Sequence, residues 1–194
     1  MQNDPLSLID DIYEAAVIPE RWTNVMHSLT AVGRGAFTSM IVLRDNQMSF
    51  VGTPEAEKLI GEYQALGKPN YNSRIPRSEA FQGIGFHTDL DVFTLEEIDN
   101  DEFYRDFLRP RGYGWITGAW VRPPSGELIN VSVEGRRENG PFQPAQVDAL
   151  NSLFPHLARS ALLSSRLQLQ RARAMASALE LVGLPAAVLR HSGK

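Results

Sequence analysis

Four histidines, which could act as bases or metal ligands, are spread along the chain with no pair at ligand spacing: His27, His87, His156 and His191. The stretch His87-Thr-Asp89-Leu-Asp91 offers a metal one nitrogen and two carboxylates. A calcium loop of the EF-hand type beginning at Asp89 would need glycine at its sixth position, where Thr94 stands. The pattern therefore indicates a strand end rather than a metal site, and we expect no metal and no cofactor.

Ser152 and His156 lie one helical turn apart, a spacing that could pair a nucleophile with a base, but no third residue of such a site is identifiable. The chain has no cysteine, which excludes thiol catalysis, disulfides and iron–sulfur clusters. It also lacks a nucleophile elbow, a Walker loop, a zinc-protease helix and a dinucleotide-binding glycine motif. These observations predict a protein that is not an enzyme; a small hydrolase using Ser152 is the alternative.

Aromatic side chains gather in the middle of the chain and predict a pocket for a small organic ligand. They surround residues 68–85, which have little periodicity and predict a long loop. Apolar pockets with a few polar groups bind such ligands. The predicted ligand-binding residues are Tyr63, Tyr71, Arg74, Phe81, Phe103, Phe107 and Trp115. The alternative is that these aromatics simply fill the core.

The elements that must position these residues come in hairpin-like pairs of strands between helices. A buried strand over 37–43 and a short strand over 48–51 form one pair, and strands over 114–121 and 128–134 form another, joined by Pro123-Pro-Ser-Gly126. Helices are predicted over 6–16, from Pro19 to Gly33, over 54–66 and, after the N-cap Thr94, over 95–109, with a short strand over 87–93. This order favours an α+β fold, an antiparallel sheet flanked by helices.

The last quarter of the chain predicts a helical stretch from Pro144 to Gly183, which Pro155 should kink or divide. The part after Pro155 would span about 42 Å at 1.5 Å per residue, so it should overhang the body of the domain. A seam of mostly small side chains recurs there at steps of three and four residues and predicts a homodimer. The predicted dimerisation residues are Ala161, Ser165, Gln168, Ala172, Met175 and Leu179. The alternative is a break near Ser164 and Ser165 that folds the helix back on its own domain.

Charge is divided unevenly between the body and this helical end. Residues 1–150 hold 13 basic and 22 acidic side chains, a net charge of −9, whereas residues 151–194 hold 6 basic and 1 acidic, a net charge of +5. The acidic body would repel a phosphate backbone and is a poor nucleic-acid binder. No apolar run approaches the ~20 residues of a membrane-spanning helix, and the N-terminus has no signal-peptide pattern, so we expect a cytoplasmic protein without membrane contact.

Several phrases resemble a group of bacterial LuxR-type transcription regulators. They are Leu8-Ile-Asp-Asp-Ile-Tyr-Glu-Ala-Ala16 with Pro19-Glu-Arg-Trp22, Leu153-Phe-Pro-His-Leu-Ala-Arg159 leading into Leu167-Gln-Leu-Gln-Arg171, and Gly183-Leu-Pro-Ala-Ala-Val188. The resemblance implies a GAF/PAS-like sensor domain over 1–143, a connecting and dimerisation helix over 144–182, and the start of a truncated further module over 183–194. It also implies that DNA is bound only through a helix-turn-helix beyond this sequence.

A narrower resemblance is to autoinducer-binding domains, whose pocket helix carries a tyrosine, a second aromatic residue and then an Asp-Pro step. Tyr63, Tyr71 and Ile75-Pro76 fall in a similar order here. Ile75 replaces the acid that would hold the amide of an acyl-homoserine lactone, which argues against that ligand. Arg74 could instead clamp a ligand carboxylate with two hydrogen bonds, or form a surface salt bridge.

The interpretation that joins these observations is a non-catalytic sensor that binds a small organic ligand, for which a carboxylate is one candidate, and that forms a homodimer. Three alternatives to this sensor function stay open. They are a dimerisation scaffold without a ligand, the input domain of a kinase or cyclase, and the small hydrolase.

Overall fold

A five-stranded antiparallel sheet lies at the centre of the computed structural model, which describes residues 5–44, 47–68, 71–123 and 126–181. The strands are arranged in the order β2-β1-β5-β4-β3. Their bounds are β1 Phe37–Arg44, β2 Gln47–Gly52, β3 His87–Thr88, β4 Tyr113–Val121 and β5 Leu128–Arg136. The antiparallel sheet with flanking helices confirms the predicted α+β class.

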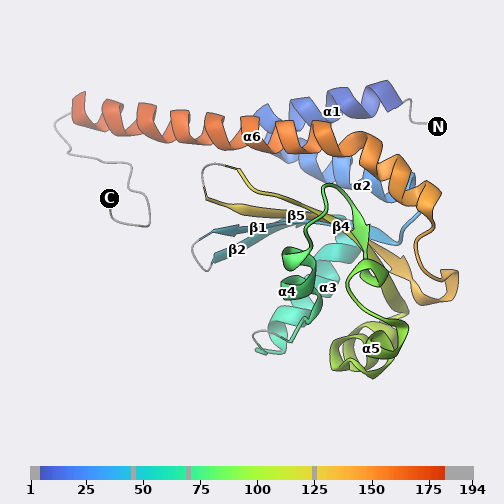
Figure 1. The fold of residues 1–194 in the computed structure, drawn as a ribbon. Helices are drawn as coiled ribbons and strands as arrows, with labels where there is room; N and C mark the ends of the chain where they lie inside the picture. The colour runs from blue at the N-terminus through green and yellow to red at the C-terminus, as the bar shows by residue number, and fades with distance from the viewer. Residues whose placement is uncertain (1–4, 45–46, 69–70, 124–125, 182–194) are drawn as a thin grey trace.

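Helices cover both faces of the sheet (Figure 1). One face carries α1 (Pro5–Val17), α2 (Trp22–Gly33) and the long α6 (Pro144–Leu181). The other carries α3 (Pro54–Ala65), α4 (Arg74–Ala80), α5 (Leu95–Asn100) and a π-helix (Phe103–Leu108). Because successive side chains of a strand point to opposite faces, each strand contributes to both layers.

The face under α1, α2 and α6 holds the main apolar core. Val131 and Val133 of β5 and Met40 of β1 are buried there with Leu8, Ile12, Val25, Met26, Leu29, Leu150, Leu153, Leu157 and Ala161 of the three helices. The hydroxyl of Ser160 donates to the carbonyl of Ile12 (2.6 Å) and ties α6 to α1. The first part of the long helix therefore packs on the sheet, as its apolar spacing predicts.

Three predicted elements between β2 and β4 differ in the structure: the loop 68–85, the strand 87–93 and the helix 95–109. Residues 68–85 contain the short helix α4, whose first amide is capped by Asn72 through Arg74 N–H to Oδ1 (3.1 Å). The predicted strand 87–93 stops after two residues, because the amide and hydroxyl of Thr88 both donate to Asp91 and close a 3-10 turn.

The predicted helix 95–109 is divided, although its N-cap Thr94 is confirmed by a reciprocal bond with Glu97. Asp101 is extended and its Oδ1 accepts the amides of Phe103 (2.9 Å) and Tyr104 (3.1 Å), which starts the π-helix as a separate element. This second start turns the aromatic side chains of the segment towards the sheet.

Helix α6 is one continuous helix of 38 residues that includes Pro155, about 57 Å long at 1.5 Å per residue. Figure 1 shows its axis changing direction in the first third and its far end running beyond the sheet. Pro155 does not divide it, and the helix does not break at Ser164 and Ser165. None of the described helices is long and apolar enough to cross a membrane. The segment 183–194, predicted as the start of a further module, lies outside the described residues.

The six predicted dimerisation residues have different surroundings on α6. Ala161 is buried in the core of its own chain, at 6% exposure. Ser165 and Ala172 are half-buried, whereas Met175 (69%) and Leu179 (42%) are exposed. The side chain of Gln168 is not among those described. A contact with a second copy can therefore use only the part of the seam after Ala161.

Candidate ligand-binding site

A cavity of about 110 Å3 lies between the second face of the sheet and the layer formed by α3, α4 and the π-helix. Its apolar lining consists of Phe37, Ile41, Met48, Leu59, Ile60, Tyr63, Ile75, Val92, Phe93, Phe103, Phe107, Ile116, Gly118 and Trp120. Its polar lining consists of Ser39, Asn72, Arg74, Ser78, His87, Thr88, Asp89, Asn130, Ser132 and Glu134. Apolar walls with a small number of placed polar groups are typical of pockets for organic molecules.

Four of the seven predicted ligand-binding residues meet at this cavity: Tyr63, Arg74, Phe103 and Phe107. Phe103 and Phe107 are stacked with ring centres 5.2 Å apart, and Tyr63 contacts both rings edge-on at 5.7 and 5.8 Å. These aromatic contacts connect α3 to the π-helix and form one wall.

The other three predicted residues, Tyr71, Phe81 and Trp115, are not in the cavity lining. Tyr71 packs edge-on against Phe103 from outside and its hydroxyl donates to a backbone carbonyl (3.2 Å). Phe81 stacks on His87 at 4.3 Å, so it supports a lining residue. The indole of Trp115 donates to the carbonyl of Arg137 (3.2 Å). Proximity in the sequence therefore did not distinguish the side chains that line the cavity from those that do not.

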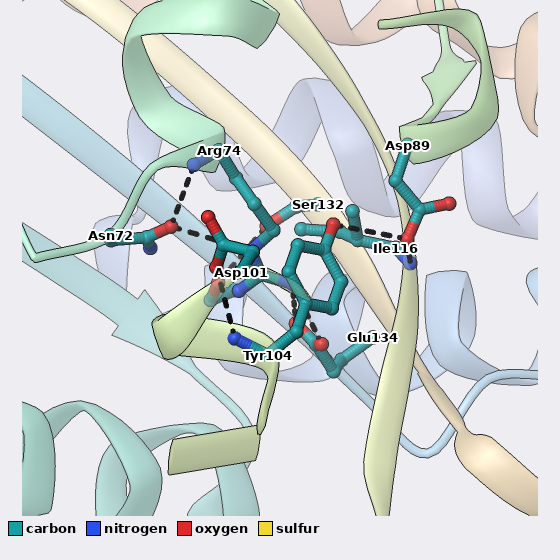
Figure 2. A network of polar contacts seen from close by, with 9 residues as sticks. Asn72, Arg74, Asp89, Asp101, Tyr104, Ile116, Ser132 and Glu134 are labelled. Atoms are coloured by element: carbon teal, nitrogen blue, oxygen red, sulfur yellow. Dashed lines mark hydrogen bonds and ion pairs between the residues drawn. The ribbon is translucent and has the colours of Figure 1, made fainter. Parts of the chain in front are cut away.

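Arg74 forms a buried ion pair with Glu134 at the edge of the cavity (Figure 2). Its Nη1 donates to Oε1 (2.8 Å) and Oε2 (3.1 Å) of Glu134, and its Nε donates to Asn72 (3.4 Å). The guanidinium lies 5.0 Å from the ring centre of Phe103. Of the two roles considered for Arg74, a salt bridge and a clamp for a ligand carboxylate, the structure shows a salt bridge with an internal carboxylate, and this salt bridge is buried rather than at the surface.

The charges of this pair depend on each other. Burial is the largest single influence on Arg74 and opposes its charge, but Glu134, Tyr104 and Asp89 together outweigh it and the pKa of Arg74 is raised. Burial raises the pKa of Glu134, and Arg74 opposes that rise. Removing either partner would leave the other charge buried without compensation.

Asp89 is a second buried acid beside this pair. Its Oδ2 accepts the hydroxyl of Tyr104 and the amide of Ile116, both at 3.2 Å, whereas Oδ1 has no partner among the described residues. Burial raises the pKa of Asp89 to about 7; Arg74 opposes this rise and Glu134 adds to it. The carboxyl groups of Glu134 and Asp89 and the guanidinium of Arg74 thus lie together at this edge of the cavity (Figure 2).

His87 and Ser78 form a neutral polar group on the opposite side. Ser78 Oγ lies 2.8 Å from Nε2 of His87 and accepts the indole N–H of Trp120 at 2.8 Å. Burial lowers the pKa of His87, which keeps the imidazole neutral. No carboxylate in the described part of the chain accepts a hydrogen bond from Nδ1 of His87, so the group that would orient it as a catalytic base is missing there.

The serine and histidine that the hydrolase alternative used do not bond to each other. The hydroxyl of Ser152 donates to the carbonyl of Ala149 (2.7 Å), and Nδ1 of His156 lies 3.2 Å from the hydroxyl of Tyr13. Both side chains are on α6, away from the cavity lining. The geometry gives this alternative no nucleophile–base pair.

Glu134, Asp89, His87 and Ser78 line the cavity and were not predicted as site residues. The sequence held one usable signal for Glu134: Asn130, Ser132 and Glu134 alternate with the apolar Ile129, Val131 and Val133, which indicates a polar second face on that strand. For the other three the sequence has no comparable periodicity.

Comparison with known proteins identifies solved structures that have the same fold as this chain. No protein-family model and no curated protein matches the chain. Among solved structures, the VqsR LBD domain from Pseudomonas aeruginosa has a TM-score of 0.61 at 16% identity, covering 83% of this chain and 94% of that one. The N-acylhomoserine lactone dependent LuxR family factor CepR2 from Burkholderia cenocepacia has 0.61 at 15%, covering 84% and 97%.

A third solved structure, SdiA in complex with octanoyl-rac-glycerol, has a TM-score of 0.52 at 17% identity and covers 87% of this chain and 69% of that one. At these identities the likeness is one of fold. The chain therefore shares its fold with the VqsR LBD domain, CepR2 and SdiA.

Proposed function

We propose that this chain is the ligand-sensing domain of a bacterial LuxR-type transcription regulator, acting in the cytoplasm without catalysis. The observation that carries the proposal is the cavity beneath the sheet. Core side chains normally interdigitate and leave few voids larger than a water molecule, yet this cavity measures about 110 Å3. A core serving stability alone would fill this space with larger side chains than Ser39, Ser132 and Gly118, whereas a sensor needs it.

The solved structures of the same fold support the proposal. CepR2 is described as dependent on N-acylhomoserine lactone, and SdiA is described in complex with octanoyl-rac-glycerol. The phrases at Leu8–Ala16 and Leu153–Arg159 point independently to LuxR-type regulators. The GAF/PAS-like character of the domain and its limits at 143 and 182 remain predictions.

Dimerisation through the far part of α6 belongs to the proposal. This part overhangs the sheet (Figure 1) and exposes Met175 and Leu179. A ligand that fits one arrangement of two paired helices better than another would shift the dimer towards it. DNA would be bound by a separate helix-turn-helix module of the regulator, in keeping with the acidic body of this domain.

Native mass spectrometry of the purified protein, compared with its denatured mass, tests both parts. We expect a dimer carrying an additional small-molecule mass. Ile60→Trp, which places a large ring in the cavity lining, should abolish the additional mass. Leu66→Trp, at an exposed position just after α3, should retain it.

The alternatives give different results in the same experiment. A dimer without additional mass, which also shows no thermal shift with a panel of small organic compounds, would replace the sensor with a dimerisation scaffold. A monomer at high micromolar concentration would refute pairing through α6.

A further inference from the structure

Four residues with small or neutral side chains lie side by side across the middle of the cavity floor. The strand registers pair Ser39 of β1 with Ser132 of β5, Ser132 with Gly118 of β4, and Gly118 with His87 of β3. All four line the cavity. We call this row, Ser39, Ser132, Gly118 and His87, the polar trough.

The rows on either side of the polar trough carry larger side chains. Phe37, Glu134 and Ile116 form one neighbouring row, and Ile41, Asn130 and Trp120 form the other. Since glycine has no side chain and serine a short one, the floor is deepest at Ser39, Ser132 and Gly118, and His87 closes one end of the row. A ligand seated in the cavity therefore contacts the sheet at these four residues.

The polar trough offers hydrogen bonds without a formal charge. The hydroxyls of Ser39 and Ser132 lie 3.3 Å apart, at 5% and 7% exposure of their residues. Their mutual bond uses one of the two hydroxyl hydrogens, so the second is able to donate to an acceptor on a ligand. His87 is neutral because burial lowers its pKa.

Charged ligand groups do not suit this floor. An anion would lie near two buried acids, Glu134 and Asp89, while Arg74 is already bonded to Glu134. A cation would lose its hydration, and Oδ1 of Asp89, the carboxylate atom without a described partner, is enclosed by protein atoms. Burying an unpaired charge costs far more than burying a neutral hydrogen-bonding group.

The size of the cavity also limits the ligand. An apolar cavity of about 150 Å3 holds one benzene ring, so this cavity of about 110 Å3 encloses at most one small ring, and a substituted ring requires its lining side chains to move. Its walls include the stacked rings of Phe103 and Phe107 and the indole of Trp120. Flat rings pack well against such walls.

We infer that the ligand is a compact, uncharged ring compound whose carbonyl or hydroxyl group is bound in the polar trough by Ser39 and Ser132. The inference rests on the proposed sensor function and adds the ligand's chemical class and the residues that select it. It excludes carboxylates, amines and long acyl chains as the main ligands.

Three probes of nearly the same shape separate the possible charges: benzamide, benzoate and benzylamine; octanamide tests chain length. Binding is measured on the full chain by NMR titration of the tryptophan indole N–H signals. Trp120 lines the cavity and should respond, whereas Trp22 and Trp115 are outside the lining and serve as internal references. Benzamide should bind about tenfold more tightly than each of the other three.

The serines are tested with the double variant Ser39→Ala, Ser132→Ala. Replacing both partners of one hydrogen bond with apolar groups should leave the fold intact and weaken benzamide binding about fivefold. Ser152→Ala, at an exposed serine of α6, is the matched control and should leave binding unchanged.

Benzoate, benzylamine or octanamide binding as tightly as benzamide would overturn the inference and leave the sensor proposal standing. An unchanged affinity of the double variant would do the same. Absence of any response, while a bound mass is present in native spectra, would also refute only the inference. Absence of both would refute the proposed function as well.

Discussion

Replacing Arg74 with methionine should destabilise the domain strongly. The carboxylate of Glu134, whose side chain is 4% exposed, receives both of its hydrogen bonds described here from Nη1 of Arg74. Methionine keeps much of the length and apolar volume but removes the charge and the donors. Loss of one partner of a buried pair costs about 3 to 5 kcal/mol, and the lost contact between the guanidinium and Phe103 adds about 0.5 to 1 kcal/mol.

Urea unfolding followed by tryptophan fluorescence measures this loss, which is a large part of the roughly 5 to 15 kcal/mol that stabilises a typical domain. The matched control is Arg77→Met. Arg77 is also on α4 and bonds Glu97, but the two side chains are 44% and 43% exposed. Exposed ion pairs contribute little, and the lost contact between the Arg77 guanidinium and Phe93, 4.4 Å from the ring centre, costs about 0.5 to 1 kcal/mol, so the control should lose much less stability than Arg74→Met.

The double variant Arg74→Met, Glu134→Gln separates charge from packing. With both charges gone no ion is left buried, so most of the lost stability should return. The coupling between the two substitutions should be about 2 to 3 kcal/mol. If Arg74→Met shifts the midpoint no further than Arg77→Met, or if the double variant loses the sum of the single losses, the argument from the buried ion pair is wrong.

Three further predictions concern pH, assembly and packing. Asp89 has a pKa of about 7 in the fold against an ordinary 3.8, so the folded state binds the additional proton and stability should fall by roughly 2 to 3 kcal/mol from pH 5 to 7. Urea midpoints across this range should vary less in Asp89→Asn, and an equal slope would contradict the assignment. Ala161→Glu should lower the melting temperature because position 161 is buried, whereas Met175→Glu should keep it and lower the dimer fraction in light scattering; equal melting losses would contradict this division of α6. Gly35→Ala should destabilise because its Cβ would overlap β5, whereas Gly61→Ala, in open space on α3, should stabilise by about 1 kcal/mol, and calorimetry showing the reverse order would refute this packing.

Much of the secondary structure follows from local patterns in the sequence. The apolar spacing of residues 6–16 corresponds to α1, and the alternation of Ile129, Val131 and Val133 corresponds to β5. Where a turn is predicted between β4 and β5, the amide of Gly126 donates to the carbonyl of Pro123 (3.1 Å). These patterns act over a few residues, because helix and strand periods are properties of the local backbone. The α+β class is predictable for the same reason.

The predicted secondary structure was wrong where a polar side chain ends a helix or starts a new one. Asp101 accepts two amides ahead of it and divides a helix that has continuous helical spacing, and Asn72 caps the short α4 within an expected loop. Pro155 was expected to kink or divide α6; the helix is continuous through it and changes direction in its first third (Figure 1), while Leu150, Leu153 and Leu157 hold both sides of the proline in the core.

By itself the sequence determined the kinds of elements, the aromatic character of the site and the presence of an unusually long last helix. Only the tertiary structure decided which side chains meet. Arg74 and Glu134 are 60 residues apart and bond because β5 lies beneath α4, and the polar trough exists because the registers of β1, β5, β4 and β3 place its four residues in one row. A shift of one residue in any of these pairings would turn that strand's trough residue to the opposite face, because side chains alternate along a strand.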